Sequence, residues 1–190
     1  MRRATALGVL IVPLLAATAV AAPKPSKVCQ LLTDPSGDTG LPQASAPIEA
    51  PSLDILSADI ASSAKTLAGV IRVRSLRDDP TTTVGAQYIL YFYVGEAEWR
   101  LTGKRQNGSN DVFTLRPPGT GASDSPIDGK FDTATNAIYF SVPRKAVPEL
   151  KNFKVTGLRS VASVSPPGTA LDSAEGNKAY VDLTPSCLPA

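Results

Sequence analysis

Apolar and polar side chains alternate along several short stretches of the chain, with the two-residue period of an extended strand. The alternation is regular between Lys65 and Leu76. There the apolar or small residues share one face and the basic residues share the other: Leu67, Gly69, Ile71 and Val73 against Arg72 and Arg74. Such a segment predicts an antiparallel strand that buries one face and leaves the other in water.

The segment from Val84 to Leu101 is the densest aromatic and β-branched stretch, and it predicts two strands joined by a short turn at Gly95. One face of the first strand carries Tyr88, Leu90, Phe92 and Val94, and the other carries Gln87, Ile89, Tyr91 and Tyr93. We expect the first face in the core. The second face has two interpretations: it packs beneath a loop or the 144–150 segment, or it is an exposed platform for a ligand.

Shorter runs of the same kind recur at close spacing, separated by connections rich in proline, glycine, serine and aspartate. Further strands are predicted at residues 28–32, 53–61, 111–116, 130–132, 137–142 and 180–183, with one or two strands in 153–164 and a helical turn within 143–150. Residues 165–177 are predicted to be a loop. The predicted fold class is all-β: an antiparallel β-sandwich, jelly-roll-like, with little helix.

The first 21 residues have the pattern of a secretory signal peptide: two arginines, an uncharged apolar run and a small-x-small motif at 19–21. Cleavage is expected after Ala21, with cleavage after Ala22 as the alternative. Residues 22–28 then form a flexible leader, and residues 29–190 a single β-sandwich domain. The chain is therefore expected to be secreted and extracellular, with no membrane span in its mature form.

The net charge of the chain depends on the signal peptide. The full sequence has 19 Lys and Arg against 17 Asp and Glu, and removal of Arg2 and Arg3 leaves 17 of each. No basic stripe remains in the mature chain, so nucleic acid and anionic membranes are not expected partners.

Two cysteines, Cys29 and Cys187, lie near the two ends of the mature chain. In an oxidising compartment an isolated pair is most simply one disulfide, which would tie the first strand region to the tail. The alternative is a lipid anchor at Cys29. Lys27 and Val28 stand where a lipid-attachment motif needs a small residue, so the disulfide is favoured.

The chain has no histidine, which excludes the usual serine and cysteine triads and most zinc sites. It also lacks the G-x-S-x-G, P-loop and G-x-G-x-x-G motifs. We therefore expect no enzyme activity. The remaining catalytic alternative is an acid-dependent hydrolase that uses paired carboxylates, for which the candidates are Asp78, Asp79, Glu96 and Glu98.

The D-P-S-G-D turn places oxygen-bearing side chains at alternating positions, namely Asp34, Ser36 and Asp38. Hard oxygen ligands on a glycine-containing loop are what calcium requires, and Asp54 from the next strand is a candidate fourth ligand. The spacing is that of the start of an EF-hand loop, but position 12 would be Ser45 instead of glutamate. The alternative is an Asx-turn without metal. No other cofactor is expected.

The order of these motifs resembles the opening of secreted β-sandwich modules of the DOMON and family-9 carbohydrate-binding type. The residues that carry the resemblance are Asp34, Gly37, Asp38, Leu53, Asp54, Ile55, Ala58 and Asp59, and it extends through Leu76. It implies a jelly-roll-like sandwich, sugar or haem as ligand, and often calcium. The chain departs from the family by having no histidine for haem and no pair of tryptophans for a sugar. Haem is therefore disfavoured, and sugar stays open.

These patterns predict a secreted, non-catalytic β-sandwich binding module, with a glycan as the candidate ligand. The expected ligand-binding residues are Tyr91, Tyr93 and Trp99 for the sugar rings, and Arg72 or Arg74 for polar contacts. The alternative is a structural or protein-interaction domain of the cell envelope, with a cell-surface protein as partner and no small-molecule ligand. The exposure of the aromatic side chains distinguishes the two.

Overall fold

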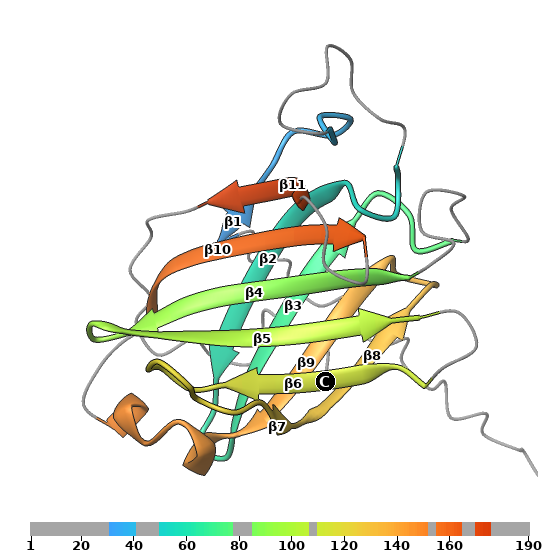
Figure 1. The fold of residues 1–190 in the computed structure, drawn as a ribbon. Coiled ribbons are helices and arrows are strands. Elements are labelled where there is room, and N and C mark those ends of the chain that lie inside the picture. Colours follow the sequence, from blue (N-terminus) through green and yellow to red (C-terminus); the bar gives the residue numbers. More distant parts are fainter. Residues whose placement is uncertain are drawn as a thin grey trace, which may run out of the picture.

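The computed structural model describes residues 31–40, 50–77, 85–106, 110–151, 155–164 and 170–175. Over these ranges the chain folds into two antiparallel β-sheets that pack against each other, so the predicted all-β sandwich is confirmed. The strand directions of the two sheets cross in Figure 1. Helix within the described ranges is limited to two short 3₁₀ segments, η2 (Arg144–Ala146) and η3 (Pro148–Lys151), where the sequence predicts a helical turn.

The smaller sheet has the strand order β1-β2-β3-β9-β8. Its strands are β1 (Leu32–Thr33), β2 (Ile55–Ser62), β3 (Thr66–Val73), β9 (Ala137–Pro143) and β8 (Asp128–Asp132). The larger sheet has the order β11-β10-β4-β5-β6-β7. Its strands are β11 (Ala170–Glu175), β10 (Val155–Val164), β4 (Ala86–Val94), β5 (Ala97–Arg105), β6 (Val112–Arg116) and β7 (Ser125–Pro126). The end strands β1 and β11 lie beside each other at one edge of the sandwich (Figure 1).

The core lies between the facing sides of the two sheets. The inner face of β4 is buried there, as its alternation predicts: Tyr88, Leu90, Phe92 and Val94. Gly69 on β3 faces this set, and a Cβ at that position would lie 2.9 Å from Leu90 Cδ2. Glycine therefore lets the two sheets approach closely at this point.

Strands β4 and β5 form the hairpin that the aromatic stretch predicts, with Val94 paired to Ala97 across a two-residue turn. Gly95 takes a φ of 65°, a left-handed conformation that glycine adopts without strain. The hydroxyl of the buried Tyr88 donates a hydrogen bond to the carbonyl of Ser52 at 2.8 Å, which satisfies its polar end inside the core.

The predicted loop at 165–177 is wrong for residues 170–175, which form β11 and pair with β10. The sequence of β11, A-L-D-S-A-E, has no β-branched or aromatic residue, so the strand depends on pairing and not on intrinsic propensity. β10 is a single strand. Gly157, with a φ of 59°, marks an irregularity in its pairing with β4 between Thr156 and Arg159.

The predicted signal peptide, leader and strand at 180–183 lie outside the described residues. Cys29 and Cys187 lie outside them too, so the disulfide stays a prediction, and the same holds for any role of Asp78 and Asp79. Across the described ranges, no helix is long and apolar enough to cross a membrane.

Candidate cation site and outer binding face

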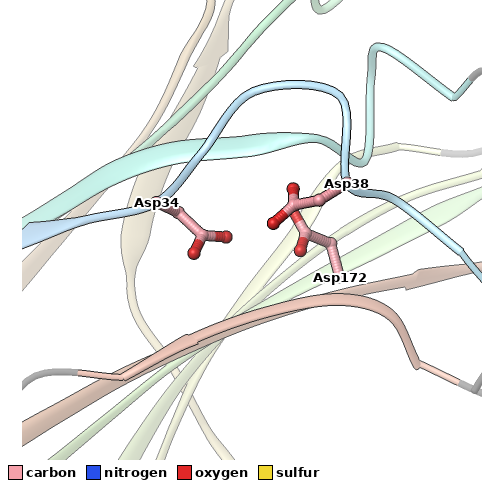
Figure 2. A group of neighbouring side chains, drawn as sticks. All are labelled: Asp34, Asp38 and Asp172. Carbon is pink, nitrogen blue, oxygen red and sulfur yellow. The ribbon is translucent and has the colours of Figure 1, made fainter. Parts of the chain in front are cut away.

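Three aspartates converge at the edge of the sandwich where β1 and β11 meet. Asp34 follows β1 directly, Asp38 lies in the turn beyond it, and Asp172 lies on β11. One carboxylate oxygen from each residue lies within 4.8 Å of the others. Figure 2 shows the three carboxylates pointing toward one another, two from the turn and one from the strand. Segments far apart in the sequence thus build one acidic cluster.

Backbone contacts fix the positions of two of these aspartates. The amide of Asp34 donates to the carbonyl of Leu56 at 3.1 Å, which holds the end of β1 against β2. Asp172 is only 8% exposed, and its Oδ2 accepts a hydrogen bond from the amide of Ile55 at 2.6 Å. The first residues of β2 therefore anchor both sides of the cluster.

Asp54 organises the turn between Asp34 and Asp38. It is fully buried, and its Oδ2 accepts a hydrogen bond from the amide of Gly37 at 2.8 Å. The same oxygen lies 3.1 Å from Nε of Arg74, which follows β3. Gly37 takes a φ of 86°, a conformation that favours glycine at this point of the turn. The other oxygen of Asp54, Oδ1, is buried and has no hydrogen-bond donor among the described residues.

Burial and mutual repulsion perturb the carboxylates of the cluster. Burial, followed by the charges of Asp172 and Asp38, raises the pKa of Asp34 to about 7. Burial is also the main cause that raises the pKa of Asp172 to about 6, with the charges of Asp38 and Asp54 adding to it and the hydrogen bond from Ile55 opposing it. Burial is the largest cause of both shifts and neighbouring carboxylates add to it, so Asp34 and Asp172 ionise less readily than free aspartates.

The structure brings together Asp34 and Asp38 of the predicted calcium ligands and places the other two differently. Ser36 Oγ lies 3.4 Å from Asp54 Oδ2, so these two residues contact each other beside the cluster. Asp172 was not predicted, because it lies in a stretch whose composition is typical of a loop. No local signal in the sequence marks it, since only the pairing of β11 at the sheet edge brings it to the turn.

The predicted ligand-binding residues do not form one surface. Tyr91 and Tyr93 are half-buried on the outer face of the larger sheet. Trp99 is 3% exposed and packs inside the core against Phe92, with ring centroids 6.5 Å apart. Arg72 lies on β3 in the smaller sheet and Arg74 directly follows that strand; they pair with Asp59 and Asp54, away from the two tyrosines on β4 in the larger sheet.

Other residues flank the two tyrosines instead. The guanidinium of Arg159, on β10, lies 3.8 Å from the centre of the Tyr91 ring. The hydroxyl of Tyr93 donates a hydrogen bond to Glu98 Oε2 at 2.8 Å, and Arg159 Nη2 lies 3.8 Å from the same oxygen. Gly157 makes room for the Tyr93 ring, because a Cβ there would lie 2.8 Å from Tyr93 Cδ2. We call these four linked side chains, Arg159, Tyr91, Tyr93 and Glu98, the tyrosine array.

A row of basic residues continues from the tyrosine array across the sheet. Arg159 and Arg100 are the cross-strand neighbours of Tyr91 on β10 and β5, and Arg116 on β6 is the neighbour of Arg100. Arg100 and Arg116 both pair with Asp124. The outer face of the larger sheet therefore presents tyrosine hydroxyl, carboxylate and guanidinium groups side by side.

No protein-family model matches the chain, and neither a curated protein nor a solved structure matches it significantly. The resemblance to DOMON and family-9 carbohydrate-binding modules therefore stays a prediction. Function has to be inferred from the geometry of the two sites.

Proposed function

We propose that this chain is a secreted, non-catalytic binding module and that it binds carbohydrate on the outer face of the larger sheet. The observation that carries the proposal is the tyrosine array, in which three neighbouring strands hold four polar and aromatic side chains in mutual contact. Groups held on paired strands keep their geometry better than groups on loops, which suits recognition of a ligand with a fixed pattern of hydroxyls.

The chemistry of the array suits a ligand rich in hydroxyl groups. Glu98 supplies acceptors, Arg159 supplies donors in a planar fork, and the Tyr93 hydroxyl can do both. The Arg159 guanidinium lies over the Tyr91 ring, so this ring is less available for stacking on a sugar than the sequence suggests. Recognition through hydrogen bonds is therefore favoured over ring stacking.

The charges on this face favour acidic sugars over neutral ones. Arg159, Arg100 and Arg116 carry three positive charges, against the two negative charges of Glu98 and Asp124 with which they pair. A uronate carboxylate or a sulfate would complete this balance through charge-assisted hydrogen bonds. Glycans with such groups are the expected ligand class.

Binding of the purified mature chain to arrayed neutral and acidic glycans tests the proposal. Arg159→Ala and Tyr93→Phe each remove one polar group from the tyrosine array, and we expect each to weaken binding about tenfold, the usual effect of losing a charge-assisted hydrogen bond. Lys130→Ala is the matched control. Lys130 lies 4.9 Å from the centre of the Tyr139 ring on the smaller sheet, so it repeats the cation–ring contact away from the proposed face.

Three results would contradict the proposal. The first is a chain that binds none of the tested glycans, which would favour a structural or protein-interaction domain instead. The second is equal loss of binding in Arg159→Ala and Lys130→Ala, which would place the ligand elsewhere, and the third is turnover of the glycan. Release of sugar products from a bound glycan, abolished by Glu98→Gln, would favour the acid-dependent hydrolase over a binding module.

A further inference from the structure

Four carboxylates crowd the edge where β1 meets β11, and one arginine neutralises them in part. Asp54 pairs with Arg74, and this is the only ion pair that Asp34, Asp38, Asp54 or Asp172 makes within the described part of the chain. Carboxylates of one charge are costly to hold together where they are buried or half-buried, and a cation bound among them would remove that cost.

The separations in the cluster fit one bound ion. Calcium binds oxygen ligands at about 2.3–2.6 Å, so two oxygens on the same ion are at most about 5 Å apart. The chosen oxygens of Asp34, Asp38 and Asp172 all lie within 4.8 Å of one another, inside this limit for every pair. Figure 2 shows the three carboxylates turned toward a common space.

A second observation concerns Asp54 and is independent of the three clustered aspartates. Asp54 is fully buried, and its Oδ1 is a buried acceptor without a donor. It adjoins both parts of the cluster, because its Oδ2 accepts a hydrogen bond from Gly37 in the turn and the next residue, Ile55, donates one to Asp172 on β11. Oδ2 of Asp34 is likewise buried without a donor. Both oxygens are therefore available to a positively charged ligand.

We propose that Asp34, Asp38 and Asp172 bind one calcium ion at the β1–β11 edge, with Asp54 beside them as a buried carboxylate that shapes the turn and adds negative charge. All the candidate ligands are oxygens, which suits a hard cation and excludes a typical zinc site. Magnesium demands a nearly ideal octahedron at short distances, whereas calcium tolerates the irregular geometry of carboxylates from a turn and a strand.

The proposed ion would link the two sheets at their edge. Asp34 and Asp38 extend from the end of β1 in the smaller sheet, and Asp172 belongs to β11 in the larger one. β11 has no intrinsic strand propensity and pairs with β10 on one side. A calcium ion here would therefore stabilise the strand that depends most on its surroundings.

Calorimetric titration of the chelator-treated mature chain tests this, with calcium chloride and magnesium chloride as the two probes and thermal unfolding as a second readout. We expect one calcium ion per chain, a dissociation constant of about 1 mM or tighter, and a higher melting temperature with calcium than with the same concentration of magnesium. No heat and no shift in melting temperature at millimolar calcium would overturn the proposal. An equal shift with magnesium would overturn the assignment to calcium.

Three single substitutions locate the site. Asp38→Asn changes an exposed ligand and Asp172→Asn keeps an oxygen that can accept the Ile55 amide, so both should fold while losing calcium affinity at least about tenfold, as expected for the loss of a charged ligand. Asp128→Asn changes an exposed aspartate on β8 and should bind calcium as the parent does. Equal affinity in Asp38→Asn and Asp128→Asn would overturn the proposed ligands. Arg159→Ala should retain calcium binding, which separates this site from the proposed glycan face.

Discussion

Two buried carboxylates, Asp54 and Asp59, have the same local design and different surroundings. Asp54 directly precedes β2 and Asp59 lies within it; both are fully buried. Each pairs with an arginine from the neighbouring β3 segment, Asp54 with Arg74 and Asp59 with Arg72. The backbones of the two segments are also hydrogen-bonded in both cases. The Arg74 amide donates to the Asp54 carbonyl, and β3, which contains Arg72, pairs with β2, which contains Asp59.

The two pairs differ in how completely the carboxylate is satisfied. Oδ1 of Asp59 accepts a hydrogen bond from the amide of Leu31 at 2.7 Å, and Oδ2 accepts from Arg72, so both oxygens have donors. Asp54 concentrates its contacts on Oδ2 and leaves Oδ1 without one. Three more aspartates lie around Asp54, namely Asp34, Asp38 and Asp172. The fully satisfied pair fits a structural role, whereas the partly satisfied one lies beside the cluster for which we propose a calcium ion.

The largest effect is expected at the balanced pair. Arg72→Met keeps most of the side-chain volume but leaves the Asp59 carboxylate buried without its cation, which should lower the free energy of unfolding by about 3 kcal/mol. Urea denaturation measures this free energy of unfolding, and the loss of stability should be the same with and without calcium. The double variant Asp59→Asn with Arg72→Met should recover part of the stability. If the single variant loses less than about 1 kcal/mol of unfolding free energy, the Arg72–Asp59 pair behaves like an exposed ion pair.

Arg74→Met should cost less than Arg72→Met, because the Arg74 side chain is 32% exposed and that of Arg72 is 17% exposed. Without calcium we expect a loss of about 1–2 kcal/mol, since solvent screens part of the charge left on Asp54. Removing a positive charge next to the cluster should also tighten calcium binding. Weaker calcium binding in this variant would mean that Arg74 acts mainly by positioning the turn and less by neutralising the nearby carboxylates.

The sequence alone predicted most of the sandwich, because alternation along β3 and β4 is strong. The inner faces of both strands, the turn at Gly95 and the β8–β9 hairpin are all confirmed. These features depend on residues close together in the chain, where a period of two and a turn residue suffice to fix the geometry.

The sites were harder to predict because they depend on which strands become neighbours. Arg72 precedes Tyr91 by one strand in the sequence, but the chain moves to the other sheet between β3 and β4. The actual neighbour of Tyr91, Arg159, comes from β10, much later in the chain. Asp172 reaches the turn by the same kind of long-range pairing. Local patterns carry no information about such contacts.

The acidic cluster should give the calcium-free chain an unusual dependence on pH. The folded chain keeps a proton on Asp34 up to about pH 7 and on Asp172 up to about pH 6, whereas unfolded aspartates release theirs near the ordinary value of 3.8. The folded state therefore binds more protons in this window, so its stability should fall as pH rises from about 4 to 7. Urea titrations at a series of pH values, in buffer that contains a chelator, measure this dependence of stability on pH. A stability that rises through this window would contradict the cluster's excess of negative charge.

The smallest expected effect concerns Asp34. Calcium should reverse the sign of the stability change that a substitution at this residue causes. Above about pH 7, where Asp34 is ionised, Asp34→Asn removes one negative charge from the cluster, so without calcium it should stabilise the fold by less than about 1 kcal/mol, after allowance for solvent screening. With saturating calcium the same variant should be less stable than the parent, because it has lost a ligand. Asp59→Asn provides the contrast, since it should destabilise the chain equally with and without calcium. A residue with a purely structural role should change the stability in the same direction with and without calcium. Destabilisation by Asp34→Asn under both conditions would therefore indicate that the cluster has a structural role and binds no calcium.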